Sequence, residues 1–492
     1  MNELQMIKRI HQGIRTSTLC LLMIFPLFAQ SATELPNIGD SSDSVMSPTS
    51  ARELGEGLLR MLRHNDMLLN DPYLQGYITN LGYRLSTASD DPGGHFVFFI
   101  VKDNSVNAFA APGGYIGVHT GLIRIAENES ELASVISHEI AHVTQNHLFR
   151  AYEGAGKQRI TTAILMLAAI LLGGGDSQVT TAAVAGGLAA GAQTSINFTR
   201  QHEKEADRLG IEILSQTGYN PYSMAVFFQR MHNATRLYGS EGPEFLRTHP
   251  VTSTRVADAQ NRAAQMQGTP SYNDEIFQLA RARAMVLSES DPQRALKIFR
   301  AKLDSTEPLA RLAAEYGYVL ALIRTRQPEI ALKRLEPMLK SKPDYLLFQL
   351  ARADALELSG QVKASLKLYD QILTATPDSR AVSMYYASAL IRNQQPEAAR
   401  KLLRSLLDKY NNDSLLHQMY ARASEKSQNI GDAYFHLAEY YYLNGNTELA
   451  IDNLSRARDV PEIDYYLRSK VDARLKQYRT TLEHKLEHKE KE

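Results

Sequence analysis

The feature that most restricts the fold of this chain is a repeat in its second half. From about residue 270 onward, helical patterns carry a small residue at spacings of 36, 34 and 34, namely at Ala295, Ala331, Ser365 and Ala399. Four positions after each comes a large apolar residue, namely Phe299, Leu335, Tyr369 and Leu403. A single helix pair cannot bury its apolar face alone, and a small residue lets two helices approach closely. The second half is therefore predicted to be a stack of helix pairs, an α-solenoid.

Other positions in this region follow the same period. Lys-Pro-Asp at 342–344 and Thr-Pro-Asp at 376–378 recur 34 residues apart, and a proline is typical of the point where a helix ends. One unit contains nearly the whole spacing pattern that resembles tetratricopeptide repeats: Tyr434, Leu437, Ala438, Tyr441, Gly445 and Ala450. We expect at least four units over 270–480, a poorly defined junction at 411–430, and a charged tail at 481–492. Stacked pairs form a concave groove suited to peptide segments or partner proteins.

The first thirty or so residues have the composition of a targeting segment. Basic residues precede an apolar run over 19–28, and small residues follow that run, which is the order found in secretory signal peptides. The run is short for a membrane span, so an uncleaved anchor is the weaker alternative. We predict a signal peptide over 1–31, with cleavage after Ser31 or, as a second choice, after Ala29.

The cysteine content indicates a compartment. Cys20 is the single cysteine of the chain and lies within the predicted signal peptide, so the mature protein would contain none. Its stability would then not depend on disulfides, even in an oxidising environment. A signal peptide with a cysteine-free product is typical of a bacterial periplasm. The following stretch, 32–50, is rich in Ser, Asp and Pro and is predicted to be a mobile linker.

Length and charge restrict the number of domains and the kinds of partner. A chain of 492 residues is too long for one ordinary core, which predicts two or three domains. Lys plus Arg and Asp plus Glu number 54 each, so the bulk charge favours no nucleic-acid partner. One region could contact a membrane: 160–192 is apolar or small in two arms, each shorter than the ~20 residues of a spanning helix. We interpret it as buried helices or an apolar lid, with peripheral membrane contact as the alternative.

A short motif in the first half points to metal chemistry. His138-Glu139-Ile140-Ala141-His142 lies in a stretch with a helical pattern, and residues four apart on a helix project from one face. Both imidazoles can then bind one zinc ion. Glu139 is rotated by about 100° from His138, so its carboxylate can reach a water at the metal without being a ligand. In a chain with 14 histidines such a pattern can also arise by chance, and a third ligand is needed.

A candidate for that third ligand lies about sixty residues downstream. Glu203, in helical surroundings, could complete a site of two histidines and one glutamate that keeps a fourth position open for water. Asp207, one turn further on, could accept the far ring N–H of a ligand histidine and fix its tautomer. Taken alone, a charged helix of this kind is more often a solvated face.

Six short motifs, in this order along 51–265, resemble those of the M48 family of zinc metallopeptidases. They are Asn107-Ala108-Phe109, Pro112-Gly113-Gly114, Gly121-Leu122, His138 to His142, Glu203 to Asp207, and Thr248-His249-Pro250 with Arg255. The resemblance implies that His138, His142 and Glu203 bind one Zn²⁺ per chain and that Glu139 is the catalytic base. It also implies that a strand at 107–109 lies beside the substrate.

His249 and Arg255 allow several interpretations. The resemblance implies that His249 is near the site, where it could stabilise the tetrahedral intermediate or occupy the fourth zinc position and keep the enzyme latent. A capping or packing histidine is the alternative. Arg255 could bind a substrate carboxylate or pair with Asp258. The remaining candidates are predicted not to be ligands: His147, His202, His484 and His488.

The predicted fold is mainly α-helical. A zincin-type metallopeptidase domain with a small β-sheet is expected over 51–265, and the α-solenoid of tetratricopeptide repeats over 270–480. Within the first domain, aromatic and β-branched runs predict a strand pair from 96–101 and 115–122, with a turn at 111–114 before the second strand. Apolar residues at spacings of three and four predict helices before the first strand.

The combination of signal peptide, M48-like domain and repeats is similar to periplasmic members of that family in Gram-negative bacteria. The resemblance implies a zinc endopeptidase with a chaperone-like role in quality control and assembly of outer-membrane proteins. Its substrates would be unfolded or misassembled outer-membrane proteins, and its repeats would contact the outer-membrane assembly machinery. Two other interpretations are a scaffold with a mostly silent zinc site and a membrane-embedded protease.

Overall fold

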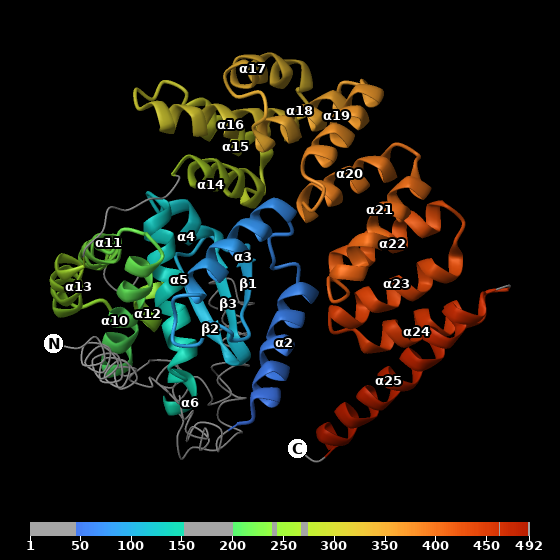
Figure 1. Ribbon diagram of the computed structural model, residues 1–492, viewed down its shortest axis with the longest axis horizontal. Helices are drawn as coiled ribbons and strands as arrows, with labels where there is room; N and C mark the ends of the chain where they lie inside the picture. Colours follow the sequence, from blue (N-terminus) through green and yellow to red (C-terminus); the bar gives the residue numbers. More distant parts are fainter. Residues whose placement is uncertain (1–45, 152–199, 239–243, 267–273, 462, 491–492) are drawn as a thin grey trace, which may run out of the picture. The chain divides into compact units, whose positions relative to one another are not determined.

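The computed structural model describes residues 46–151, 200–238, 244–266, 274–461 and 463–490 (Figure 1). The predicted signal peptide, most of the predicted linker and the apolar region 160–192 lie outside the described residues. Within the described part, no helix combines the length and apolar composition that crossing a membrane requires.

A three-stranded sheet forms the centre of the first domain. Its strands are β1 (Val97–Val101), β2 (Ala108–Ala111) and β3 (Tyr115–His119), in the order β1-β3-β2. The two strands predicted from the sequence pair in parallel as β1 and β3, and β2 adds an antiparallel edge that the strand pattern did not predict. β3 ends at His119, earlier than the predicted residue 122, because the Gly121 N–H donates to the Asp103 carbonyl instead of to a neighbouring strand.

The turn between β2 and β3 depends on glycine. Pro112–Gly114 forms a single 3-10 turn, in which Gly113 and Gly114 have φ values of 74° and 84°. Residues with a side chain rarely adopt this left-handed region, so these two glycines allow the chain to reverse within three residues. The reversal places β2 against β3 and leaves β2 at the sheet edge.

Helices surround this sheet. They are α2 (Pro48–His64), α3 (Pro72–Ser86), α4 (Thr120–Ile125), α5 (Glu129–Thr144), α6 (His147–Ala151), α10 (Arg200–Gln216), α11 (Tyr222–Tyr238), α12 (Phe245–Thr248) and α13 (Ser253–Gln265). α2 begins inside the predicted linker, because the Ser47 hydroxyl accepts the Ser50 N–H and Pro48 takes the first helical position. α3 packs against β1, and α5 packs against β2, α3 and α10.

α5 is buried along most of its length, which is unusual for a helix with polar residues. Its N-cap Asn128 accepts the Glu131 N–H, and its residues from Glu129 to His142 are all buried. Leu132, Ile136 and Ile140 belong to the main apolar core of the domain. The polar residues of α5 are therefore held inside the protein, where each of them needs a partner.

The second half of the chain consists of helices α14 (Asp274–Ser288), α15 (Pro292–Arg300), α16 (Pro308–Arg324), α17 (Pro328–Ser341), α18 (Leu346–Leu358), α19 (Val362–Ala375), α20 (Arg380–Arg392), α21 (Pro396–Lys409), α22 (Ser414–Lys426), α23 (Ile430–Leu443), α24 (Thr447–Arg458) and α25 (Tyr465–Glu490). The fold-class prediction is confirmed, since a mainly helical first domain with a small sheet is followed by stacked helices. The four small repeat residues and their apolar partners are all buried.

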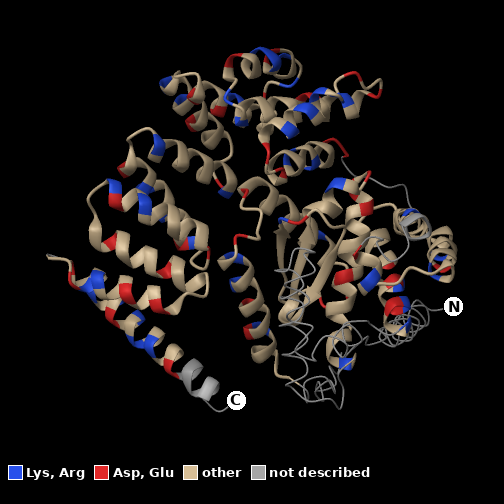
Figure 2. Cartoon of the chain, turned by 180° about the vertical axis from the view of Figure 1, so that it is seen from behind, with Lys and Arg blue, Asp and Glu red and all other residues tan. Residues whose placement is uncertain are grey.

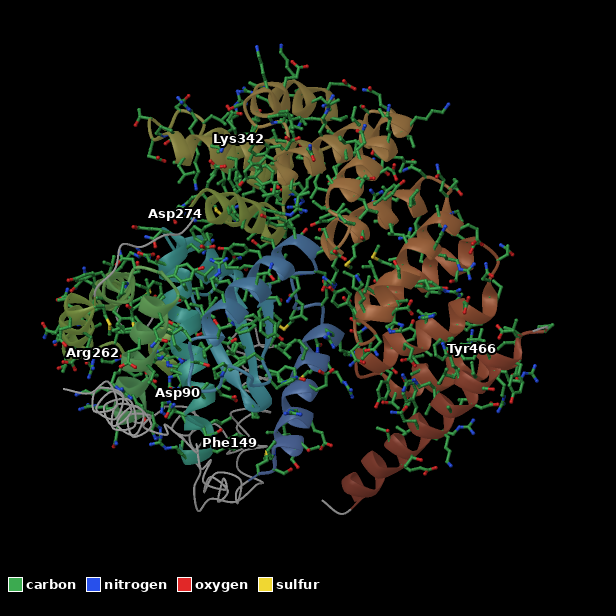
Figure 3. The ribbon with its side chains drawn as sticks, viewed as in Figure 1. Asp90, Phe149, Arg262, Asp274, Lys342 and Tyr466 are labelled. Atoms are coloured by element: carbon green, nitrogen blue, oxygen red, sulfur yellow. The ribbon has the colours of Figure 1, made fainter. Side chains whose placement is uncertain are left out.

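Two details of the repeat region add to the expectation. The junction at 411–430 is occupied by α22, which Asp413 caps by accepting the Leu415 and Leu416 N–H groups. The repeat pattern is weak there because Asn412-Asp413 stands where two earlier units have Pro343-Asp344 and Pro377-Asp378. α25 continues to Glu490, so the helix backbone extends through most of the predicted charged tail. Its first turn carries Tyr466, which is 69% exposed (Figure 3).

Several polar contacts join the first domain to the repeats. Asp274, at the start of α14 (Figure 3), accepts the backbone N–H of Glu129 at the start of α5 at 3.1 Å. A buried ion pair forms between Arg283 of α14 and Asp71, which also caps α3. Lys, Arg, Asp and Glu are otherwise interspersed along the helices (Figure 2), in keeping with the balanced charge of the sequence.

Two histidines of the repeats should make the stability of the folded protein depend on pH. His417 of α22 and His436 of α23 stack, with their Nδ1 atoms 2.9 Å apart. Burial lowers the pKa of both rings, and the pKa of His436 falls well below 6.5 with a further contribution from His417. The unfolded chain therefore takes up protons first as the pH falls below about 6.5. We expect the free energy of unfolding to decrease between pH 7.5 and 5.5, by at most about 1.4 kcal/mol per histidine over this range.

Urea denaturation followed by circular dichroism at both pH values measures this effect. The variant His436→Phe should lose part of the pH dependence, whereas the same exchange at the exposed His64 should leave it unchanged. Equal pH dependence in the wild type and His436→Phe would show that this histidine pair does not cause the change in stability.

Candidate metal centre

α5 carries the first three residues of the site. His138 and His142 are one turn apart on the same face, and their Nε2 atoms lie 3.0 Å from each other. Glu139 follows His138 and is fully buried beside them. The Glu139 carboxylate accepts no well-formed hydrogen bond from the described residues. α5 thus presents two converging imidazole nitrogens and one carboxylate at a single buried point.

α10 brings two carboxylates to this point. The two Glu203 carboxylate oxygens lie 3.6 Å from His138 Nε2 and 3.4 Å from His142 Nε2. Asp207 Oδ1 lies 3.0 Å from the other ring nitrogen of His138, Nδ1. The approach of α10 to α5 depends on Gly210, where a Cβ atom would lie 3.3 Å from the backbone nitrogen of His138 and 2.9 Å from Met224 Cε.

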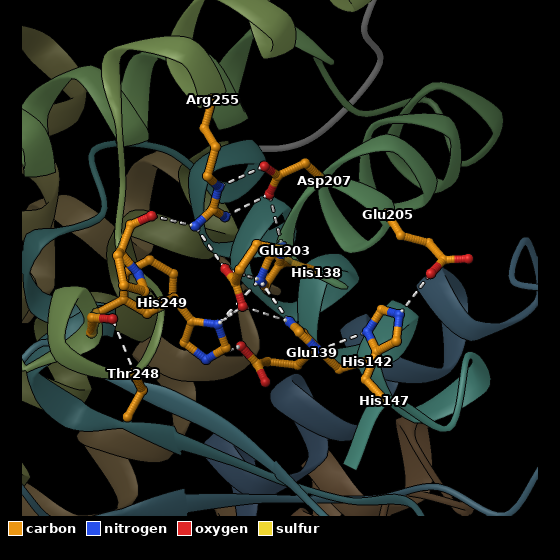
Figure 4. A network of polar contacts seen from close by, with 12 residues as sticks. His138, Glu139, His142, His147, Glu203, Glu205, Asp207, Thr248, His249 and Arg255 are labelled. Carbon is orange, nitrogen blue, oxygen red and sulfur yellow. Dashed lines mark hydrogen bonds and ion pairs between the residues drawn. The ribbon is translucent and has the colours of Figure 1, made fainter. Parts of the chain in front are cut away.

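His249 completes the group from a third direction. It follows α12, its backbone N–H donates to the Phe245 carbonyl, and its ring stacks on the Phe245 ring. His249 Nδ1 lies 3.0 Å from Glu203 Oε1 and 3.3 Å from His138 Nε2, while its Nε2 lies 3.5 Å from Glu139 Oε1 (Figure 4). The structure therefore brings His249 to the site, where the family resemblance led us to expect it.

The donor atoms fit a metal ion. One atom from each of His138, His142, Glu203 and His249 lies within 4.8 Å of the others, and none of these residues is more than 2% exposed. Imidazole nitrogens whose lone pairs converge repel one another unless a proton or a cation lies between them. Nitrogen and carboxylate ligands in a buried group of four are typical of divalent zinc.

Arg255 has a role that the sequence did not indicate. Its guanidinium donates to both carboxylate oxygens of Asp207 at 2.7 Å and lies 2.6 Å from Glu203 Oε2. Neither interpretation from the sequence is supported, because the side chain is only 4% exposed and Asp258 faces Lys204 instead. Arg255 and Asp258 share α13, but the arginine is on the face that packs against α10. Its charge balances the two buried carboxylates.

The acidic side chains of the site differ in the direction in which their pKa values are shifted. Burial opposes ionisation of Glu203, but His249, His138 and His142 together lower its pKa well below the usual value. Arg255 and His138 likewise lower the pKa of Asp207 against the effect of burial. Burial raises the pKa of Glu139, and the nearby histidines offset this only in part. Glu203 and Asp207 are therefore held as carboxylates, while Glu139 is closer to exchanging a proton at neutral pH.

The histidines are also affected by their carboxylate partners. Burial disfavours a charge on His138, yet the hydrogen bonds and charges of Asp207 and Glu203 raise its pKa to about 9. Burial lowers the pKa of His142 well below the usual value in spite of Glu203. A cation between the rings would replace the proton that the two carboxylates otherwise stabilise on His138.

The other predicted residues lie as follows. Asn107 precedes the edge strand β2, which contains Ala108 and Phe109 and packs against α5. His147 and His202 lie outside the group of four, stacked on each other with ring centroids 4.5 Å apart. The side chains of His484 and His488 are not among those described.

A histidine pair from one helix and a carboxylate from a second helix, next to the edge of a small sheet, define the site as that of a metallopeptidase. The sequence profile of peptidase family M48 matches residues 72–263, and profiles of the tetratricopeptide repeat match 316–380 and 356–423. The chain belongs to peptidase family M48, and its second half is built of tetratricopeptide repeats.

The bacterial relatives align with about two thirds of the chain. It is 36% identical over 320 residues to the beta-barrel assembly-enhancing protease of Escherichia coli, which covers 65% of this chain and 66% of that protein. The protein of the same name from Yersinia pestis is 33% identical over 343 residues, covering 68% and 70%. The mitochondrial metalloendopeptidase OMA1 of Arabidopsis thaliana is 27% identical over 221 residues, covering 44% and 42%. The match thus spans about two thirds of the length of the bacterial relatives.

Proposed function

We propose that this chain is a zinc-dependent endopeptidase in which His138, His142 and Glu203 bind the metal and Glu139 is the general base. The observation that carries the proposal is the convergence of buried imidazole and carboxylate atoms within 4.8 Å next to a buried Glu139. Membership of family M48 supports the same ligand set.

Each residue has a separate part in the proposed reaction. Zinc, when bound, would polarise the peptide carbonyl and lower the pKa of a water molecule. Glu139 would take the proton of the attacking water and later deliver it to the leaving amine, for which a pKa raised by burial is suited. Asp207 would fix the tautomer of His138 by accepting its Nδ1–H, and Arg255 would hold Asp207 in place.

The substrate would bind in an extended conformation. β2 pairs with β3 on one side and is at the edge of the sheet, so its other side can pair with a peptide backbone. We infer that the strand segment Asn107, Ala108 and Phe109 contacts the substrate, because α5, which carries Glu139, packs against β2. Recognition through backbone hydrogen bonds depends little on the side chains of the client, which suits unfolded polypeptides.

The cellular role is inferred from the relatives. The bacterial relatives are named for enhancing β-barrel assembly, and the sequence predicts a signal peptide at 1–31. We infer a periplasmic enzyme that degrades unfolded or misassembled outer-membrane proteins, with repeats that contact the outer-membrane assembly machinery. The long stack of repeats also favours a second, compatible function, a chaperone-like binding of clients without cleavage.

Metal removal tests the proposal. The purified protein loaded with one Zn²⁺ per chain is expected to cleave unfolded casein, to lose this activity with a chelator, and to regain it when zinc is added back. The physical reason is that Glu139 has no activated water to deprotonate when the metal is removed. Gel analysis of casein measures cleavage. Cleavage that is insensitive to chelation would contradict a zinc enzyme, and binding without cleavage would favour the chaperone-like function.

His249 is proposed to occupy the fourth metal position and to keep the enzyme latent, because its ring lies within the ligand group. The variant His249→Ala is then expected to cleave casein several-fold faster, since a ligand that excludes water is removed. Initial rates at equal zinc occupancy provide the measurement. A lower rate would instead support stabilisation of the transition state, and an unchanged rate would contradict both roles.

A further inference from the structure

The His147 ring contacts the side of the His142 ring that faces away from the metal group (Figure 4). The Nε2 atom of His142 faces the metal group, and its Nδ1 atom lies 2.9 Å from Nδ1 of His147. On the far side, His147 Nε2 lies 3.1 Å from Glu205 Oε2 of α10, and Arg150 donates to the same oxygen at 3.1 Å. These side chains form a line from the metal group toward the partly exposed Glu205.

The direction of the hydrogen bonds along this line follows from the chemistry of the rings. A neutral imidazole has one N–H group and one lone pair. If His142 uses the Nε2 lone pair toward a metal, its proton is on Nδ1 and donates to Nδ1 of His147. His147 must then carry its own proton on Nε2, where it donates to Glu205. Metal binding at one end and a carboxylate at the other thus fix which ring nitrogen donates and which accepts in each hydrogen bond of this line.

We propose that His147 is a positioning residue, which fixes the tautomer and the ring orientation of His142 for metal binding. The inference rests on the proposed function, since it assumes a metal at the group of four. It parallels the support of the other ligand histidine: His138 faces the carboxylate of Asp207 directly, whereas His142 reaches the Glu205 carboxylate through a second imidazole. Partners of this kind typically raise metal affinity about 10- to 100-fold.

The local backbone is what brings His147 to this position. Residues five apart on a continuous helix point about 140° away from each other. α5 ends at Thr144, however, and Asn146 adopts a left-handed φ of 51° before α6 begins at His147. Asparagine tolerates this conformation better than most residues with a side chain. The helix is therefore interrupted between Thr144 and His147, and the His147 ring stacks on His202 of α10.

Zinc affinity of the full chain, measured by competition with a chromophoric chelator, tests the proposal. His147→Phe keeps an aromatic ring but removes the acceptor, and is expected to weaken zinc binding about 10- to 100-fold. His147→Asn places an amide oxygen near the position of the lost Nδ1 and is expected to restore most of the affinity. Glu205→Ala, at a partly exposed position, should weaken binding in the same direction but by a smaller factor.

The matched control is His417→Phe. His417 has the same Nδ1 to Nδ1 contact at 2.9 Å, with His436, but lies in the repeats, so the exchange should leave zinc affinity unchanged. Wild-type affinity in His147→Phe would overturn the inference while leaving the proposed function intact. If His147→Phe does not fold, wild-type affinity in Glu205→Ala overturns it. A wild-type protein that binds no zinc would overturn both the proposed function and the inference.

Discussion

Replacing Glu139 by glutamine is expected to lower the rate of casein cleavage by about 10²- to 10⁴-fold, the range associated with loss of a general base. Glutamine has nearly the same shape but cannot take a proton from water. Because Glu139 is proposed as a base and not as a ligand, the zinc content should remain at one per chain. Initial cleavage rates and zinc content, measured on the same preparation, separate these two effects.

The same exchange should leave the fold intact. Burial raises the pKa of Glu139, which means that its charged form is disfavoured inside the folded protein. An uncharged side chain removes that cost, so the free energy of unfolding should be unchanged or higher. Glu127→Gln, at a side chain that is 65% exposed, is the control and should cleave at the wild-type rate. Equal cleavage by Glu139→Gln and the wild type would refute the proposed mechanism.

The second large effect is expected at the buried ion pair between Asp71 and Arg283. Arg283 donates to both Asp71 carboxylate oxygens, at 2.9 and 2.7 Å, and Tyr385 of α20 donates to one of them at 2.8 Å. The contact joins α3 of the peptidase domain to two helices of the repeats. Asp71→Ala would leave the Arg283 charge buried without its partner, and we expect a loss of about 3–5 kcal/mol in the free energy of unfolding.

The pair is tested by denaturation of single and double variants in urea. Replacing both residues with apolar ones, as in Asp71→Leu with Arg283→Met, should destabilise less than Asp71→Ala alone, because no unpaired charge remains. The exposed pair of Lys409 and Asp378 serves as the control, and Asp378→Ala should cost less than about 1 kcal/mol. A similar loss in Asp71→Ala and Asp378→Ala would show that the buried pair contributes little.

The pKa of Asp71 sets the pH range of this effect. Although burial opposes it, Arg283 and Tyr385 hold the pKa of Asp71 below its usual 3.8. The pair therefore contributes its full stability at neutral pH and loses it only as the pH falls below about 4. The histidine pair of the repeats, in contrast, loses its contribution already below about 6.5.

The repeats show how much of the fold local pattern can predict. Ala331 and Ala399 are buried where two helices meet, because only a small side chain fits there, and this requirement is visible as a period in the sequence. The segment of α22 was expected only as a poorly defined junction at 411–430, because Asn412-Asp413 lacks the proline of Pro343-Asp344 and Pro377-Asp378. Strand β2 was expected only from the family resemblance, since its four residues of Ala and Phe have no alternating pattern.

The candidate site was likewise predictable from the sequence only in part. The spacing of His138 and His142 places them on one helix face by the geometry of the α-helix alone, and Glu203 with Asp207 repeats that spacing on α10. The partners of Arg255 and His147 did not follow from spacing. Arg255 contacts residues 48 and 52 positions away, and His147 reaches His142 only because the helix between them ends.

The sequence by itself determined the periodic features, namely the solenoid and the two pairs of polar residues one turn apart, because helix geometry relates neighbours along the chain directly. Only the tertiary structure decided that Arg255 and His147 contact those pairs, whereas the place of His249 near them was already expected from the family resemblance. Contacts of this kind depend on how α5, α10 and α13 pack and on one left-handed residue, Asn146, and packing between distant segments leaves no period in the sequence.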